Sequence, residues 1–348
     1  RPVFALVLVV VSTVALAACG DGGSQAPAVA TPPEATGAEV IEGTGTFPVT
    51  VEHRFGETTI SAEPQRVVSV GLTEQDILLQ FGVIPVAVTE WYGDQPDATW
   101  PWAHDLLGDT EPVVLSDDDG LEFEKIAGLD PDLIIGTNAG MTKRDYELLS
   151  QIAPTVSSIP DSLPYFSPWP DQVLQVARAL GREADGQELV DRVQADYARV
   201  AEFHADEWEG KTATFSQGEP YSGILYVYPD DLSTAFLTDL GFTITPGLEP
   251  FAPDIGSQAE ISAENVELLE ADVVVWATES SEGFDKLQAF STVADLPAVK
   301  EQRSVYTDGT LAGAVYFLTP LSLEYVLENL TPMLEKAVAS EAPIAFPT

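Results

Sequence analysis

Short runs of aliphatic and β-branched residues recur along the first half of the chain, and helical patterns separate them. The apolar runs predict buried strands at 66–70, 83–88, 132–136 and 155–159. Apolar positions at three- and four-residue spacing predict helices at 73–81, 122–129 and 143–152. Alternation of this kind is typical of a parallel sheet with helices on both faces.

The second half of the chain repeats this alternation. Its apolar runs predict strands at 212–216, 224–228, 272–276 and 304–307. The helical patterns fall at 232–240, 263–270 and 321–338. We therefore expect an α/β fold made of two parallel-sheet lobes of the doubly wound type.

A long amphipathic segment lies between the two series. Within Gln187–Glu207, apolar positions recur at Leu189, Val193, Tyr197, Val200 and His204. This predicts one helix of about 30 Å that bridges the lobes and restrains hinge motion between them. The expected division is an N-terminal lobe at 49–165, a linking segment with the long helix at 166–210, and a C-terminal lobe at 211–348.

The start of the chain has the pattern of an export signal. Arg1 precedes an apolar run from Val3 to Val11, which is too short for a transmembrane helix, and small residues follow. Leu16-Ala17-Ala18-Cys19 resembles the lipobox of bacterial lipoproteins, in which the cysteine is lipidated. We expect a signal peptide at 1–18 and, from lipidated Cys19 to residue 48, a flexible Gly-, Pro- and Ala-rich tether. The alternative is a plain secretory signal with a coincidental cysteine.

Charge and composition exclude several classes of function. The 15 Lys and Arg against 56 Asp and Glu give a net charge of −41, which would repel nucleic acid and anionic membrane surfaces. An alternative interpretation of the dense acidity is adaptation to a salty habitat. A single cysteine excludes an internal disulfide framework and a Cys-cluster zinc site, and the three histidines lie far apart.

Two fifteen-residue segments align without a gap at an offset of 140. Residues 123–137 and 263–277 each read as a helix that opens with a glutamate, then an acidic turn, then a buried strand. The alignment matches Glu124 with Glu264 and Asp132 with Asp272. The plain alternative is that any helix–turn–strand unit shares this pattern, because glutamate is favoured in a first helical turn.

Together these segments resemble one family: the lipoprotein siderophore-binding components of bacterial ABC importers, a class that also contains cobalamin and haem binders. The resemblance covers residues 48 to 340 and rests on Phe55–Ile60, Pro64–Val68, Phe123–Ile126, Asp130–Ile134 and Ser262–Val266. It implies two lobes joined by a rigid helix, a shallow ligand cleft between them, and action as a monomer at the outer face of the cell membrane. It also implies that Glu124 and Glu264 dock onto arginines of the membrane permease.

Ligand residues are expected in the loops at the carboxyl ends of the strands. Aromatic residues gather there, although some of them would pack locally beneath their loops. The candidates are Trp91, Tyr92, Trp100, Trp102, Tyr165, Trp169, Tyr221 and Tyr228. Asn138 and Arg144 follow another strand; Asn138 either donates to a ligand or shapes its turn, and Arg144 either faces the cleft or lies solvated.

The scarcity of cations favours one class of iron chelate. Only 14 basic residues follow Cys19, so a neutral or cationic ferric hydroxamate suits the chain better than an anionic triscatecholate. The iron's ligands would then come from the siderophore, and no protein-bound cofactor or metal is expected. Haem or cobalamin remains the alternative cargo. A secreted acidic hydrolase is the enzyme alternative, but the sequence has no G-x-S-x-G elbow, P-loop or H-E-x-x-H motif.

Overall fold

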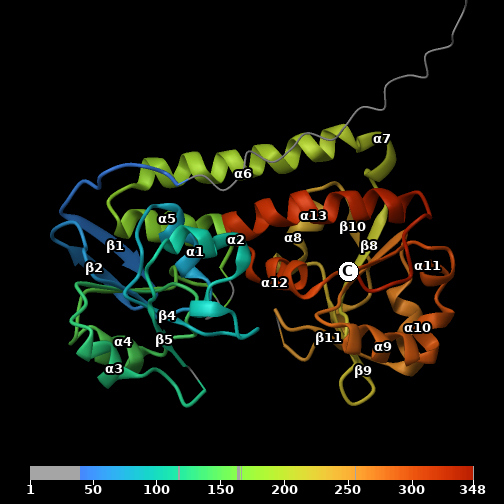
Figure 1. The fold of residues 1–348 in the computed structure, drawn as a ribbon, viewed down its shortest axis with the longest axis horizontal. Helices are drawn as coiled ribbons and strands as arrows, with labels where there is room; N and C mark the ends of the chain where they lie inside the picture. The colour runs from blue at the N-terminus through green and yellow to red at the C-terminus, as the bar shows by residue number, and fades with distance from the viewer. Residues whose placement is uncertain (1–39, 117, 163–164, 166, 255, 348) are drawn as a thin grey trace, which may run out of the picture. The chain divides into compact units, whose positions relative to one another are not determined.

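The computed structural model describes residues 40–347, with gaps at 117, 163–164, 166 and 255. The predicted signal peptide, the lipidation site at Cys19 and most of the tether therefore lie outside the described residues. The described residues all belong to one compact unit. Figure 1 shows that this unit contains two α/β lobes, as the hydrophobic pattern predicts.

The N-terminal lobe is built on a five-stranded parallel sheet in the order β5-β4-β3-β6-β7. Its strands are β3 (Val67–Ser69), β4 (Ala87–Thr89), β5 (Val113–Leu115), β6 (Leu133–Gly136) and β7 (Thr155–Ser157). An antiparallel hairpin of β1 (Val49–His53) and β2 (Gly56–Ile60) precedes it. The helices are α1 (Glu74–Gln80), α2 (Pro101–His104), α3 (Phe123–Gly128) and α4 (Lys143–Leu149), with 3-10 turns at Pro96–Ala98 and Asp105–Leu107.

The C-terminal lobe contains a six-stranded sheet in the order β11-β9-β8-β12-β13, with β10 also paired to β8. The strands are β8 (Thr212–Gln217), β9 (Ile224–Tyr228), β10 (Thr243–Ile244), β11 (Ala259–Ser262), β12 (Val273–Ala277) and β13 (Ser304–Tyr306). The core strands β8, β12 and β13 are parallel as expected. Strand β9 runs antiparallel to both β8 and β11, so the sheet is mixed and 224–228 is not the parallel strand that we expected.

Helices surround this second sheet. They are α8 (Ala235–Thr238), α9 (Ser281–Ala289), α10 (Ser291–Asp295), α11 (Pro297–Lys300) and α12 (Gly309–Phe317). Three 3-10 segments lie at Leu232–Thr234, Glu249–Phe251 and Ala263–Leu269. The last of these occupies the position where the sequence predicts a helix over 263–270.

Two long helices connect the lobes. Helix α6 (Glu183–Phe203) begins four residues before the predicted bridge, and the short α7 (Ala205–Trp208) completes it. Helix α6 packs on α5 (Trp169–Ala179) and on the last helix, α13 (Pro320–Val338). Helix α13 also contacts α1 and α2 of the N-terminal lobe as well as β12 and β13 of the C-terminal lobe. Both helices therefore span the two lobes, and α6 can be followed along one side of them in Figure 1.

The largest of the apolar clusters in the described structure contains residues of both lobes, and further clusters lie within each lobe. The largest cluster includes Val51 and Leu78 from the first lobe, Val193 from α6, Phe215 from the second lobe and Leu330 from α13, each almost fully buried. Burial of apolar surface is the main favourable term in folding. Because this surface is shared, separating the lobes would expose it, and the lobes are held together as one packed body.

The repeat at an offset of 140 has the same structural role in each lobe. The Asp132 carboxylate accepts the backbone N–H groups of Gln65 and Arg66, just before β3, both at 2.8 Å. The Asp272 carboxylate accepts the N–H of Thr212, the first residue of β8, also at 2.8 Å. Each aspartate thus joins the start of its own strand to the start of the neighbouring strand. The aligned segments are equivalent parts of the two lobes.

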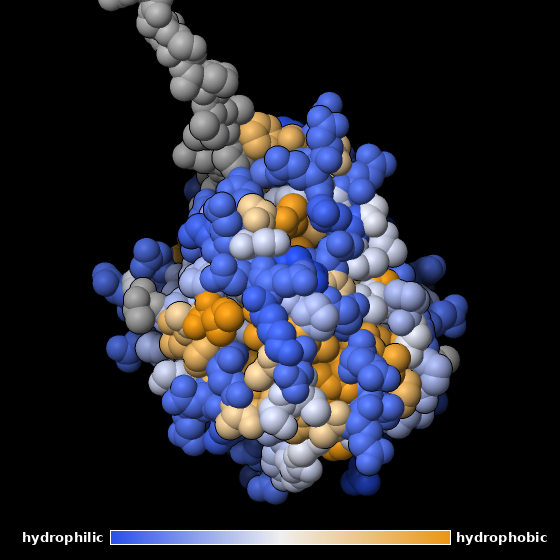
Figure 2. Space-filling model, turned by 90° about the vertical axis from the view of Figure 1, so that its right-hand side faces the viewer, coloured by the Kyte–Doolittle hydropathy of each residue, from blue (hydrophilic) through white to orange (hydrophobic). Residues whose placement is uncertain are grey.

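The face of the C-terminal lobe shown in Figure 2 is predominantly hydrophilic. Figure 2 shows the end of the molecule formed by the C-terminal lobe, where hydrophilic side chains surround small apolar patches. None of the helices in the described part of the chain is long and apolar enough to cross a membrane. Within the same residues, no group of three or more His, Cys, Asp or Glu side chains is placed to hold a metal ion.

Candidate functional site

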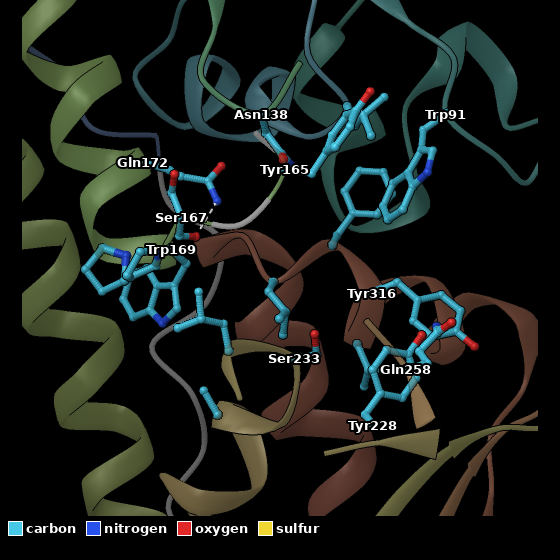
Figure 3. A pocket seen from close by; sticks show the side chains of 18 of the residues that line it. Trp91, Asn138, Tyr165, Ser167, Trp169, Gln172, Tyr228, Ser233, Gln258 and Tyr316 are labelled. Carbon is cyan, nitrogen blue, oxygen red and sulfur yellow. Dashed lines mark hydrogen bonds between the residues drawn. The ribbon is translucent and has the colours of Figure 1, made fainter. Parts of the chain in front are cut away.

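A cavity of about 770 Å³ lies where the two lobes and the linking segment meet (Figure 3). The N-terminal lobe contributes Leu72, Trp91, Tyr92, Asn138 and Tyr165 to its lining. The linking segment between the lobes, defined above, contributes Ser167, Pro168, Trp169, Pro170, Gln172 and Gln194. The C-terminal lobe contributes Gln217, Tyr228, Leu232, Ser233, Ala235, Asp239, Gln258, Glu279 and Val315 to Leu318. This volume lies within the range of small-molecule binding sites.

The strand ends of the N-terminal sheet form the first wall. Leu72 follows β3, Trp91 follows β4 and Asn138 follows β6, as the carboxyl-end rule predicts. Asn138 also shapes its turn, because its side-chain amide donates to the Thr73 hydroxyl at 3.1 Å. Its side-chain oxygen is buried and has no hydrogen-bond partner among the described residues.

A buried carboxylate supports this wall from behind. Glu74, in the first turn of α1, accepts the backbone N–H of Asn138 at 2.6 Å and the hydroxyl of Thr137 at 3.1 Å. Burial raises the pKa of Glu74, although these hydrogen bonds act in the opposite direction. The loop after β6 is thus tied to α1, which fixes the position of Asn138.

Tyr165 covers the same loop. Gly140 has a φ of +57°, and a Cβ at this position would lie 2.0 Å from the Tyr165 ring. A glycine is therefore required here both by the backbone conformation and by the close approach of the ring. Trp169, at the start of α5, forms the side of the cavity nearest to α6 in Figure 3, beside the hydrogen bond from the Gln172 amide to the Ser167 carbonyl.

Tyrosine rings dominate the wall formed by the C-terminal lobe. Tyr228 stacks on Phe215 with ring centroids 4.5 Å apart, and Tyr316 lies 6.2 Å from Tyr228 and 5.9 Å from Tyr92. Burial raises the pKa of Tyr228 to about 12 and also raises the pKa values of Tyr92 and Tyr316. These three phenols are therefore neutral hydrogen-bonding groups at physiological pH.

Two of the predicted tryptophans do not line the cavity. Trp100 is only 4% exposed and packs beneath Tyr92, with its ring stacked on Trp102 at 5.0 Å between centroids. The Trp102 indole N–H donates to the Asp76 carboxylate at 2.8 Å, and the ring packs on Phe317. Trp100 is buried and Trp102 partly buried because the loop folds back onto α13 and the end of α12. They support the cavity lining from below.

Two further predicted residues lie outside the lining. Arg144 is exposed in the first turn of α4, on the solvated side of that helix. Tyr221 is 71% exposed in the turn between β8 and β9. Because β9 is antiparallel, this turn is a hairpin tip and not a loop that crosses back over the sheet. Of the ten predicted ligand residues, the lining contains Trp91, Tyr92, Asn138, Tyr165, Trp169 and Tyr228.

The charged side chains of the described lining are all acidic. Among the described residues that line the cavity, none is a lysine, arginine or histidine, whereas Asp239 and Glu279 carry carboxylates. Burial raises the pKa of both groups, and nearby Glu219 raises the pKa of Glu279 further. The cavity is therefore an aromatic and amide-lined site with an acidic field.

The two repeated glutamates occupy equivalent exposed positions. Glu124 is in the first turn of α3, and Glu264 is in the first turn of the 3-10 segment before β12. Both side chains are exposed, and neither forms an ion pair with another described residue. Each lobe thus presents one available carboxylate on a corresponding element.

Comparison with known proteins identifies the family. Residues 67–311, which include most of both lobes, match the model of a family described as periplasmic binding protein. This chain belongs to the periplasmic binding protein family. A solved periplasmic solute-binding protein from Mycobacterium smegmatis is 40% identical, covers 84% of this chain and 99% of its own, and superposes with a TM-score of 0.77. The two-lobe α/β fold expected from the sequence is confirmed.

Other relatives of this periplasmic binding protein have names that refer to iron chelates. Streptococcus pneumoniae PiaA, solved in complex with ferrichrome, is 26% identical with a TM-score of 0.70 and covers 84% of this chain and 99% of its own. The ferric-anguibactin-binding protein FatB of Vibrio anguillarum is 34% identical over 133 residues, which are 36% of each chain. The alignments with FatB and the other curated relatives span about two fifths of the relatives' length or less.

Sequence reasoning missed several residues that line the cavity of this binding protein. Gln217 ends β8 and Glu279 follows β12, so the carboxyl-end rule could have found both. Tyr316 and Phe317 end the apolar helix α12, where no feature of the sequence distinguishes cavity residues from core residues. Asp239 lies at the end of the short helix α8, and only the folded structure brings it to the cavity.

Proposed function

We propose that this protein captures a ferric siderophore outside the cytoplasmic membrane and delivers it to the permease of an ABC importer. The observation that carries the proposal is an aromatic cavity between two lobes in a chain of the periplasmic binding protein family. The complex of PiaA with ferrichrome and the ferric-anguibactin-binding protein FatB support an iron chelate as the ligand. The proposed role is capture without turnover, with the iron coordinated by the siderophore.

Among siderophores, the proposal favours the hydroxamate type. A ferric triscatecholate carries several negative charges and needs cations around it, whereas the described lining offers two carboxylates and no basic side chain. Neutral or positively charged ferric hydroxamates avoid this repulsion. Their apolar linkers can pack on Trp91 and Trp169, and their oxygens can accept from tyrosine hydroxyls and side-chain amides.

Titration of the intrinsic tryptophan fluorescence tests this function. The probes are ferrioxamine B, ferrichrome, ferric enterobactin, ferric citrate, haem and cobalamin. We expect saturable quenching with a Kd below about 1 μM for a ferric hydroxamate, because the iron chelate would lie beside Trp91 and Trp169. Trp91→Phe should remove part of the quenching. Trp208→Phe, at a fully buried position outside the lining, is the matched control and should retain it.

The other probes decide between the alternatives. Saturation by haem or cobalamin alone would replace the siderophore with one of those cargoes. Binding of none of the six would contradict the proposal, and turnover of a glycoside or ester substrate would then favour a secreted hydrolase.

We also propose that the protein is anchored to the outer face of the cell membrane through lipid on Cys19. The apolar run and the Leu-Ala-Ala-Cys motif support this, and the tether would separate the binding domain from the membrane. In the native host, Cys19→Ser is expected to move the protein from the membrane fraction to the soluble extracytoplasmic fraction. Retention of the variant in the membrane fraction would contradict the lipid anchor.

A further inference from the structure

Glu279 has no cationic partner in the described structure. It follows β12 and lines the cavity, close to Glu219. Lys286, which pairs with this Glu219, is already engaged, because its amine lies 2.6 Å from Glu219 and 3.1 Å from Glu282. Glu279 therefore faces the cavity as an uncompensated negative charge.

Three tyrosine rings line the same cavity as this carboxylate. Tyr92, Tyr228 and Tyr316 lie near enough for Glu279 to affect the pKa of each phenol. The ring of Tyr316 lies between the other two, at 5.9 Å from Tyr92 and 6.2 Å from Tyr228. The hydroxyl oxygen of Tyr92 is buried without a hydrogen-bond partner among the described residues, whereas the Tyr316 hydroxyl interacts with that of Tyr228. Figure 3 shows Tyr228 and Tyr316 on this side of the cavity, next to Gln258.

Aromatic rings beside a carboxylate form an environment suited to an organic cation. The faces of phenol rings attract an ammonium group, and a carboxylate supplies its counter-charge. Asp239 adds a second negative charge to the same cavity, and its side chain has no ion pair with another described residue. A ligand without positive charge would cover these carboxylates and remove their water without compensation.

We propose that this cavity selects a ferric chelate that carries a positively charged amine, with Glu279 as the counter-ion and Tyr92, Tyr228 and Tyr316 as the rings around that amine. This proposal rests on the proposed function and specifies the ligand class within it. The selected feature is the charge of the ligand's organic part, and the iron-binding groups themselves are contacted by the remaining polar lining.

Two probes that differ only at the amine test the proposal. Ferrioxamine B carries a terminal ammonium group, and its N-acetylated derivative has the same ferric trihydroxamate but no charge at that end. We expect the wild-type protein to bind ferrioxamine B about tenfold more tightly than the acetylated probe. Glu279→Gln should weaken binding of ferrioxamine B about tenfold and should not weaken binding of the acetylated probe, because the variant no longer buries an uncompensated carboxylate.

Glu282→Gln is the matched control. Glu282 lies three residues away, is paired with Lys286 and does not line the cavity, so the preference for ferrioxamine B should persist. Equal affinity of the wild type for both probes, or an equal loss for both with Glu279→Gln, would overturn the proposal and leave the siderophore-binding function intact. The proposed function itself fails only if no ferric chelate binds.

Discussion

The double variant Glu124→Ala, Glu264→Ala is expected to reduce uptake of the ferric siderophore by at least about tenfold. Each exposed carboxylate can accept a bidentate hydrogen-bonded pair from an arginine, and two such points on one packed body fix the orientation of docking. Neither residue lines the cavity, so the affinity for the ligand should not change. Single variants should show smaller losses, because one contact would remain.

Uptake of a radioactive ferric chelate by cells that contain the native permease measures this effect. Fluorescence titration of the purified variant provides the affinity of the ligand. The matched control is Glu188→Ala, Glu202→Ala, which removes two exposed glutamates from α6 and the same total charge. Full uptake by the Glu124, Glu264 variant would contradict the docking assignment, and an equal loss in both double variants would indicate a general effect of charge.

Asp76→Asn is expected to remove a contribution to stability that increases as the pH falls. Asp76 lies in α1, is fully buried, and accepts from the Trp102 indole at 2.8 Å and from the Thr319 hydroxyl at the start of α13 at 2.6 Å. It therefore links the first lobe to the helix that spans both. Burial raises its pKa to about 6 from a model-peptide value of 3.8, although both hydrogen bonds act in the opposite direction. Asparagine has the same shape but does not titrate.

The direction in which the free energy of unfolding changes with pH follows from the protons that each state binds. Between the unfolded and folded pKa values the folded state binds more protons than the unfolded state, so the free energy of unfolding increases as the pH falls. Relative to the Asn variant, the wild type should gain up to about 3 kcal/mol between about pH 7 and about pH 4. Urea denaturation at several pH values measures the difference, and Asp109→Asn, at an exposed position, is the control. A pH-independent difference between Asp76→Asn and the wild type would contradict the raised pKa.

Most of the fold could be predicted because its strands and helices have strong local patterns. Buried parallel strands such as Leu133–Gly136 and Val273–Ala277 are continuous apolar runs, and the bridging helix has a regular apolar stripe. The direction of β9 could not be predicted, since alternating residues within one strand carry no information about its partner. The hairpin β1–β2 was not predicted from the sequence. Its polar residues face solvent on one side, so its apolar residues do not form a continuous run.

The candidate site was harder to predict, because an aromatic residue in a loop can either face a cavity or pack beneath its own loop. Trp91 and Trp100 lie nine residues apart in one loop, yet one faces the cavity and the other packs beneath it. Their separation depends on where the loop meets α12 and α13, which come more than two hundred residues later. The absence of basic residues from the described lining, in contrast, agrees with the low cation content of the sequence.

The shared apolar core also constrains how the chain folds. Val51 of the first hairpin and Leu330 of the last helix belong to one cluster, so contacts between distant parts of the sequence are essential to it. Such long-range contacts slow folding, because a large loop must close before they form. During export from the N-terminus, neither lobe can bury its full apolar surface until α13 has emerged. We therefore expect the chain to remain incompletely folded, and dependent on protection from aggregation, until almost all of it has crossed the membrane.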